Sequence, residues 1–196
     1  VFDNIVPTSI QNLINIYSKE YTRFAYCPST VPGEYGVIGK DEYESVQFVD
    51  MVLRREHGPN SNQLVDEKHK PYLNLILSPL LNALSHKPYL LDIEEVDRVK
   101  FNLQLKVDEK YKGKHNTPHI DHHPVMEGMW NGLYYVNDND GNTNFFDLNG
   151  DIDINVFGDI SQLEARKQYY EKFGELKIKK SVKAKKGRFV VFRGDV

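Results

Sequence analysis

The chain of 196 residues is 40% hydrophobic and 27% charged, which suits one globular domain with a substantial core and excludes a disordered or fibrous protein. Its net charge of −3 gives no footprint for nucleic acid or an anionic membrane, and no apolar run nears the roughly 18 residues of a membrane span. A single cysteine, Cys27, excludes an internal disulfide and a cysteine-based zinc cluster, and with no signal peptide we expect a cytoplasmic protein.

The first predicted helix covers residues 7–19. Its apolar residues recur at i, i+3, i+4 and i+7, which is one helical face: Ile10, Leu13, Ile14 and Tyr17. Thr8 and Gln11 fit a capping box, with Pro7 before it. Residues 27–40 carry two prolines and three glycines and are predicted to form a loop.

A strand and a second helix follow. Residues 46–54 suit a strand or a helix, and we favour a strand; residues 57–62 are a predicted loop. Residues 71–86 predict a buried helix that supports a sheet, with Pro79 expected to kink or divide it. Its apolar stripe consists of Leu73, Ile76, Leu77, Leu80, Leu81 and Leu84.

The second half of the chain predicts mostly antiparallel strands. Residues 98–107 alternate strictly between apolar and polar side chains, so this strand has one polar face toward solvent or toward a wet pocket. Residues 130–148 predict strand, turn and strand, with a hairpin signal at Asp140-Gly141. A second such signal lies at Asn149-Gly150 within residues 145–157.

The last segments are a predicted helix, or an insertion between strands, at residues 160–173, and two strands within 175–196 joined near Lys186-Gly187. The order of elements predicts an α+β fold whose β part forms a small sandwich or jelly roll. We expect a single domain over residues 1–196, with helical support in about 1–95 and the β core in about 96–196.

The candidate functional stretch is TPHIDHHP, residues 117–124. In an extended segment His119 and Asp121 project from the same face, so an imidazole nitrogen and a carboxylate oxygen could bind one metal ion. A two-histidine, one-carboxylate iron site needs one more histidine and leaves three positions for substrate and oxygen. The alternative is a solvated polar loop, since a lone H-x-D pair also arises by chance.

Four stretches in a fixed order resemble one enzyme family: RVKFNLQLKV, NTPHIDHH, GLYYVNDNDGNTNFF and KKGRFVVFRGDV. Together they make the chain similar to the iron(II)/2-oxoglutarate-dependent dioxygenases, in the prolyl 4-hydroxylase-like branch found in many phage and marine microbial genomes. The resemblance covers most of the chain. It implies a double-stranded β-helix, a jelly-roll or cupin-like core, supported by N-terminal helices.

The resemblance also assigns residues. His119 and Asp121 match the iron ligands, Tyr135 matches a tyrosine that meets the distal carboxylate of 2-oxoglutarate, and Thr143 matches a pocket-lining position. Alternation agrees, because Leu133, Tyr135 and Asn137 share one face. Asn102 and Gln104, on the polar face of the strand at 98–107, either line the same pocket or face solvent.

One departure concerns the end of the sequence. By the resemblance, the second iron histidine and a basic residue that binds 2-oxoglutarate follow the GRFVVF strand, and no histidine occurs after His123. We expect the chain to continue past Val196 and to supply both. A degenerate, inactive member is the alternative, and His115 or His123 as a substitute ligand lies too close in sequence to give the usual geometry.

The resemblance implies an enzyme that uses iron(II), 2-oxoglutarate and O2 to hydroxylate an unactivated C–H bond of a prolyl or other peptidyl substrate or a small metabolite, in the cytoplasm, including that of a virus-infected microbial cell. The acidic net charge argues mildly against DNA as substrate. Two alternatives remain open: an inactive β-helix that serves as a binding or structural module, and a zinc hydrolase on a similar barrel, since mixed His/Asp ligation also suits zinc.

Overall fold

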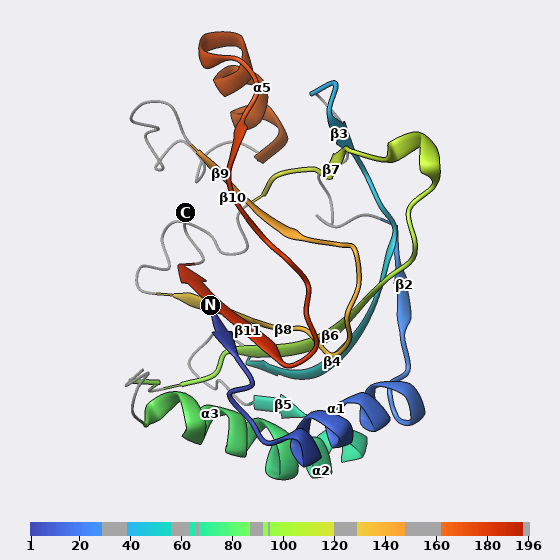
Figure 1. Cartoon of the computed structure of the whole chain (residues 1–196), viewed down its shortest axis with the longest axis vertical. Coiled ribbons are helices and arrows are strands. Elements are labelled where there is room, and N and C mark those ends of the chain that lie inside the picture. Colours follow the sequence, from blue (N-terminus) through green and yellow to red (C-terminus); the bar gives the residue numbers. More distant parts are fainter. Residues whose placement is uncertain are drawn as a thin grey trace.

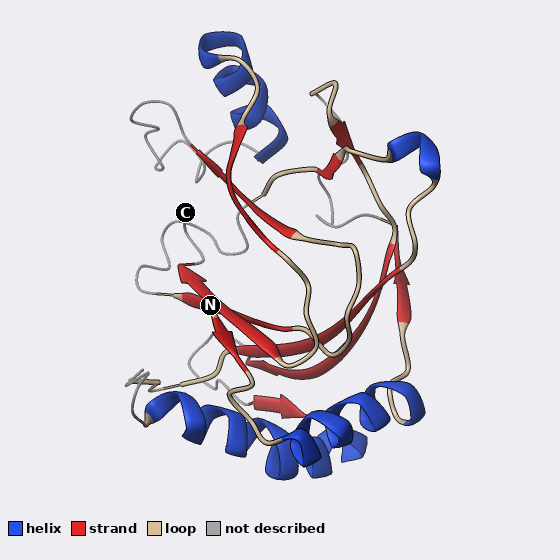
Figure 2. Cartoon of the chain, viewed as in Figure 1, coloured by secondary structure: helices blue, strands red, loops and turns tan. Residues whose placement is uncertain are grey.

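A computed structural model describes residues 1–28, 39–55, 63–65, 67–86, 92–93, 95–119, 129–147 and 162–193. Short, mostly antiparallel sheets are covered on one side by helices α1 (Thr8–Glu20), α2 (Lys70–Tyr72) and α3 (Ser78–Ser85), whereas strands β9 (Thr143–Asp147) and β10 (Lys177–Val182) lie on the other side (Figures 1 and 2). The predicted α+β class is therefore confirmed. A jelly-roll barrel is not, because no sheet closes on itself among the described strands.

Helix α1 (Thr8–Glu20) confirms the first predicted helix, but its start differs from the capping box. Pro7 is the N-cap and no side chain caps the helix. Gln11 is instead buried and donates from Nε2 to Val6 O at 3.1 Å and to Asn4 Oδ1 at 3.2 Å. Ile14 and Tyr17 face the core as expected, whereas Leu13 is 45% exposed.

Pro79 divides the second helix as predicted, without ending it. The described helix runs from η1 (Glu67–His69) through α2 (Lys70–Tyr72) and a π-helical turn η2 (Leu73–Leu77) into α3 (Ser78–Ser85). Proline has no N–H and its ring collides with the carbonyl four residues earlier in a regular helix. The widened turn accommodates this, since the Ser78 N–H reaches Leu73 O instead. Leu80 and Leu84 are buried in the core.

The predicted strand at 46–54 is confirmed as β4 (Gln47–Arg55), which lies at the centre of a four-stranded sheet. It pairs antiparallel with β2 (Ala25–Cys27), β5 (Gln63–Val65) and β6 (Arg98–Gln104). Strands therefore also occur before residue 95, where we expected helical support.

We call the side of this sheet toward α1–α3 the helical face and the opposite side the inner face. Phe101 of β6 is buried on the helical face with Ile14, Tyr17 and Tyr72. The apolar side of β6 is covered only in part, because Leu103 and Leu105 are 42% and 53% exposed and the strand ends at Gln104 rather than at 107.

A buried polar cluster ties α1 to β4 under the helices. The Tyr17 hydroxyl donates to Lys68 O at 2.9 Å and lies 2.8 Å from Nδ1 of the fully buried His69. His69 Nε2 lies 3.2 Å from Asp50 Oδ1, which also accepts from Lys68 Nζ at 3.1 Å. Burial raises the pKa of Asp50, but the hydrogen bonds from the Arg23 N–H and from Lys68, with the nearby His69, outweigh burial, so the pKa is lowered.

The strands of the second half are confirmed, but the hairpins are not. β8 (Trp130–Tyr134) pairs antiparallel with β11 (Arg188–Arg193), and β9 (Thr143–Asp147) pairs antiparallel with β10 (Lys177–Val182). The Asp140-Gly141 turn therefore joins two sheets rather than two paired strands. The turn itself forms, since the Gly141 N–H donates to Asn139 Oδ1 at 2.8 Å.

The N-terminal strand β1 (Phe2–Asp3) adds to the other edge of β11 and completes a sheet β1-β11-β8. Both faces of β11 are covered by apolar residues. Phe189 packs against Ile5, Val6, Leu80 and Leu84 on the helical side, whereas Val190 packs against Tyr135, Val182 and Ala184 on the inner side. A strand buried on both faces explains the unbroken apolar run FVVF.

The remaining described elements are a parallel pair of β3 (Glu42–Tyr43) and β7 (His115–Asn116), the short helix η3 (Glu109–Tyr111), and α5 (Gln162–Phe173), which confirms the predicted helix at 160–173. The loop predicted at 57–62, most of that at 27–40 and the turn at Asn149-Gly150 lie outside the described residues. No helix in the described ranges is long and apolar enough to span a membrane.

The turn between β10 and β11 is where the two halves of the chain meet. Gly187 has φ of +77°, and an added Cβ would lie 2.6 Å from Gln11 Oε1. Its carbonyl accepts from the Asn4 N–H at 3.1 Å, and its N–H donates to Tyr135 O at 3.0 Å. Gln11 cannot move aside without losing its bonds to Asn4 and Val6, so only glycine fits here.

We expect Gly187→Ala to lower the free energy of unfolding more than Gly113→Ala. Both glycines have positive φ, which costs alanine about 1 kcal/mol, but nothing lies within 4 Å of a Cβ at Gly113. The collision with Gln11 should bring the loss at Gly187 to about 2 kcal/mol or more. Urea unfolding of both variants measures this difference. Equal losses of unfolding free energy would show that the Gln11 side chain can move away from the added methyl group.

Candidate functional site

The segment that leads to His119 is held by a short parallel pairing. The His115 N–H donates to Asp41 O at 3.0 Å and the Thr117 N–H donates to Tyr43 O at 3.2 Å. The His115 ring packs edge-on against Phe146 of β9, with ring centroids 4.8 Å apart. These contacts fix the start of the predicted H-x-D segment beside β9, the strand that carries Thr143.

His119 is exposed, and its Nδ1 lies 3.1 Å from Thr117 O. Because a carbonyl oxygen only accepts, His119 donates this hydrogen bond from its Nδ1–H. Asp121, the second predicted ligand, and its neighbours His122 and His123 lie outside the described residues. His115, considered as a substitute ligand, has its Nδ1 3.0 Å from Asn116 O and its ring on Phe146.

Tyr135 and Thr143, the two residues assigned to the 2-oxoglutarate pocket, are in direct contact. Tyr135 Oη lies 2.5 Å from Thr143 Oγ1. Tyr135 follows β8 and Thr143 begins β9, so this hydrogen bond joins two sheets. The backbone fixes Tyr135 further, since its N–H donates to Arg188 O at 2.9 Å.

The surroundings of the Tyr135 hydroxyl are apolar. Tyr135 is 8% exposed in a cluster with Val182, Ala184 and Val190, and three partly buried side chains pack against it: Leu133, Phe145 and Phe192. Burial raises the pKa of the Tyr135 phenol, opposed by its hydrogen bonds with Thr143 and by the charge of Arg188. The phenol therefore stays protonated, and can donate, at neutral and mildly alkaline pH.

Asn102 and Gln104 are exposed and lie on the inner face of β6. Asn102 pairs with Val49 and Gln104 pairs with Gln47. Both alternate with the buried Phe101 along β6, so their side chains point to the opposite face of the sheet. Leu133 and Tyr135 share the same apolar cluster, as alternation predicted, and Asn137 is exposed. No measured contact joins Asn102 or Gln104 to Tyr135 or Thr143, so their role in a pocket stays a prediction.

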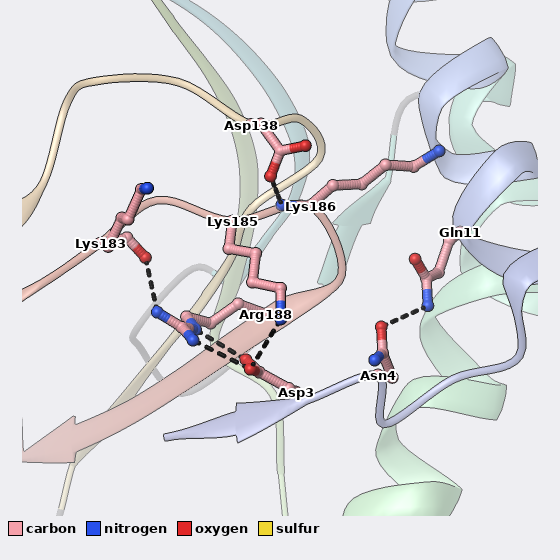
Figure 3. Close-up of polar contacts among 8 residues, drawn as sticks. All are labelled: Asp3, Asn4, Gln11, Asp138, Lys183, Lys185, Lys186 and Arg188. Carbon is pink, nitrogen blue, oxygen red and sulfur yellow. Dashed lines mark hydrogen bonds and ion pairs between the residues drawn. The ribbon is translucent and has the colours of Figure 1, made fainter.

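Sequence reasoning missed an ionic clasp at the N-terminus. Arg188 donates from Nε to Asp3 Oδ1 at 2.7 Å and from Nη2 to Oδ2 at 2.9 Å, and Lys185 Nζ lies 3.2 Å from Oδ2 (Figure 3). The Lys186 N–H donates to Asp138 Oδ1 at 2.9 Å beside it. The clasp holds β1 on β11 at Arg188, the residue whose carbonyl accepts from the Tyr135 N–H. No local signal predicts it, since Asp3 and Arg188 are 185 residues apart.

A second missed feature is a buried ion pair between α5 and β3. Glu42 Oε2 lies 3.2 Å from Arg166 Nη1, with side chains 1% and 8% exposed. The Tyr170 hydroxyl donates to the other carboxylate oxygen, and burial together with this bond raises the Tyr170 pKa. Glu42 pairs directly with His115, so the ion pair holds α5 against the strands that lead to His119.

No group of three His, Cys, Asp or Glu side chains that could hold a metal ion occurs among the described residues, a set that does not include Asp121. The chain matches no protein-family model, no curated protein and no solved structure. The site therefore has to be interpreted from its own residues.

We expect the Asp3 clasp to stabilise the protein at neutral pH and to weaken in acid. The bond from Arg188 is the largest influence on Asp3, burial opposes it and Lys185 adds to it, so the Asp3 pKa is lowered. A lowered carboxyl pKa contributes stability that is complete above about pH 4 and declines as the pH falls toward the lowered value. The urea midpoint of Asp3→Asn should therefore fall below wild type at pH 7 and approach it at pH 3.

Asp147→Asn is the matched control, since Asp147 forms an exposed pair with Lys179 at 3.0 Å. Such pairs contribute little, and its midpoint should stay near wild type at both pH values. A deficit for Asp3→Asn that is equally large at pH 7 and pH 3 would contradict the ionic clasp.

Proposed function

We propose that the protein is an iron(II)- and 2-oxoglutarate-dependent dioxygenase that hydroxylates an unactivated C–H bond. The observation that carries the proposal is the Tyr135–Thr143 hydrogen bond. Two residues that the family resemblance assigns to one cosubstrate pocket come from different sheets, and their hydroxyl groups meet in an apolar setting.

The strand pairing supports the same proposal. The first of these four strands in the chain, β8, pairs with the last, β11, and the two strands between them, β9 and β10, pair with each other. The two pairs belong to different sheets. One long hairpin folded across two layers gives this pattern, which is typical of jelly rolls. It is the pairing expected of a double-stranded β-helix, which we include in the proposal.

The donor chemistry of His119 fits iron(II). A hydrogen bond from its Nδ1–H to Thr117 O would hold the imidazole ring in one orientation, as backbone carbonyls do behind ligating histidines. Asp121, two residues later, would supply a carboxylate oxygen on the same side of an extended segment. His119 and Asp121 are thus the proposed protein ligands.

Bound iron(II) with 2-oxoglutarate and O2 supplies the oxidation, in which the substrate C–H becomes C–OH and 2-oxoglutarate is released as succinate and CO2. The chain itself would bind and orient. One O–H of the Tyr135–Thr143 pair is donated within the pair, and the other would be donated to the distal carboxylate of 2-oxoglutarate. The surrounding apolar side chains of Leu133, Phe145 and Phe192 would exclude water. A peptidyl side chain, prolyl first, is the proposed substrate class, with a small metabolite as the alternative.

The direct test is an anaerobic titration of the full-length protein with iron(II) and then 2-oxoglutarate, followed by the visible metal-to-ligand charge-transfer band. We expect the band in the wild type and its loss in Asp121→Ala, with the circular dichroism of the variant unchanged. A wild-type protein that binds neither iron nor 2-oxoglutarate would leave a binding module as the better description. Binding of zinc in preference to iron, with hydrolysis that needs no oxygen, would favour the hydrolase.

The neighbouring tyrosines Tyr135 and Tyr134 provide a matched pair of variants. Tyr135→Phe should weaken 2-oxoglutarate binding about tenfold, because a hydrogen bond to a charged group contributes about 1.5 kcal/mol. Tyr134 faces the helical side, and its buried hydroxyl has no partner among the described residues. Tyr134→Phe should therefore leave the dissociation constant, measured from the same band, unchanged. Equal effects in the two variants would remove Tyr135 from the cosubstrate pocket.

A further inference from the structure

Positive charge is concentrated in one segment of an otherwise acidic chain, from β10 to the start of β11. Residues 177–188, KIKKSVKAKKGR, contain seven lysines and arginines and no acid. The whole chain has 25 basic and 28 acidic residues, so the other residues hold 18 basic against 28 acidic and carry a net charge of −10. Such segregation creates a local field that composition alone hides.

Only part of this charge is used inside the protein. Lys185 and Arg188 bind Asp3, Lys179 binds Asp147, and Lys186 donates to Asn12. Within the described part of the chain, the other three cations have no ion-pair partner: Lys177, Lys180 and Lys183. Figure 3 shows the Lys183 ammonium group pointing away from the Asp3–Arg188 pair.

These lysines lie on or directly after strand β10, one edge of which has no partner among the described strands. Among the described strands β10 pairs with β9 alone. Its side chains from Lys177 to Ser181 are all exposed, including Ile178 at 48%. An unpaired edge offers backbone N–H and C=O groups to another strand, and lysines on it repel the same edge of a second copy. The same lysines would attract a strand that carries acidic side chains.

We propose that this edge of β10 binds an extended acidic peptide segment by strand addition. Main-chain hydrogen bonds to the edge would supply part of the affinity, and acidic side chains spaced along the peptide would meet Lys177, Lys180 and Lys183. The observations favour a peptide over single-stranded nucleic acid. Bases bind by stacking on aromatic side chains, and β10 has none, whereas the exposed Ile178 suits a peptide side chain. The site goes beyond the proposed oxygenase activity and does not depend on it.

The test is fluorescence polarisation with the full chain and a labelled dodecapeptide of alternating glutamate and threonine, without iron or 2-oxoglutarate. We expect saturable binding that weakens with added salt. The triple variant Lys177→Glu, Lys180→Glu and Lys183→Glu should bind about tenfold more weakly or worse. The control triple Lys19→Glu, Lys106→Glu and Lys112→Glu makes the same change in net charge at exposed sites elsewhere and should bind like wild type.

Two further probes test the mode of binding. The same peptide with two threonines replaced by proline loses main-chain donors and should bind clearly more weakly. A labelled dodecathymidylate should bind more weakly than the acidic peptide. No binding of the peptide, equal loss in both triple variants, equal affinity of the proline peptide, or tighter binding of the oligonucleotide would each overturn the proposal. Thermal melts of the two triple variants confirm that both fold.

Discussion

The structure depends on the β8–β11 pair, because one face of this pair packs against the helices and the other packs against the apolar cluster around Tyr135. Alternate residues of β11 enter two apolar clusters, Phe189 and Val191 toward the helices and Val190 and Phe192 toward the inner side. The same alternation separates the neighbouring tyrosines, since Tyr134 packs under α3 and Tyr135 reaches Thr143. A slip of one residue in the β8–β11 pairing would exchange the two rings. The backbone bonds of Tyr135 to Arg188 and Gly187, at 2.9 and 3.0 Å, fix this register at its end.

Local sequence patterns predicted the longer helices and strands, but not the short strands β2, β3, β5 and β7, nor which strands pair. Period 3.6 identified α1 and period 2 identified β6, whereas β4, β8, β11 and α5 were predicted from their local composition. The pairing depends on contacts between distant residues. Asp140-Gly141 has the composition of a hairpin turn, yet its flanking strands find better partners in β10 and β11, where Phe145 and Leu133 can enter one apolar cluster. The Asp140-Gly141 sequence therefore predicted the turn correctly, but the predicted pairing of the two flanking strands was wrong.

Alternation predicted only part of the candidate site, namely that Leu133, Tyr135 and Asn137 share one face. The family resemblance, and not spacing, assigned Tyr135 and Thr143 to one pocket, and their hydroxyl groups are in contact across two sheets. Asp3, in contrast, reaches its partner Arg188 across almost the whole chain, and an aspartate near an N-terminus has no distinguishing pattern. Gln11 fitted a capping box by sequence, but Pro7 is the N-cap of α1. The buried amide of Gln11 instead donates to Asn4 Oδ1 and Val6 O.

The basic run between Lys177 and Arg188 performs two physically different tasks, and the position of Asp3 separates them. Near the turn, Lys185 and Arg188 share one carboxylate, which neutralises part of their charge and holds the N-terminal strand against β11. No described acid plays that part for Lys177, Lys180 or Lys183, and β10 is exposed on both faces from Lys177 to Ser181. The clasp at Asp3 uses Lys185 and Arg188, and it does not explain the three further lysines at or next to the edge of β10. An extended acidic peptide bound along β10 would account for the positive charge that the described residues leave unpaired.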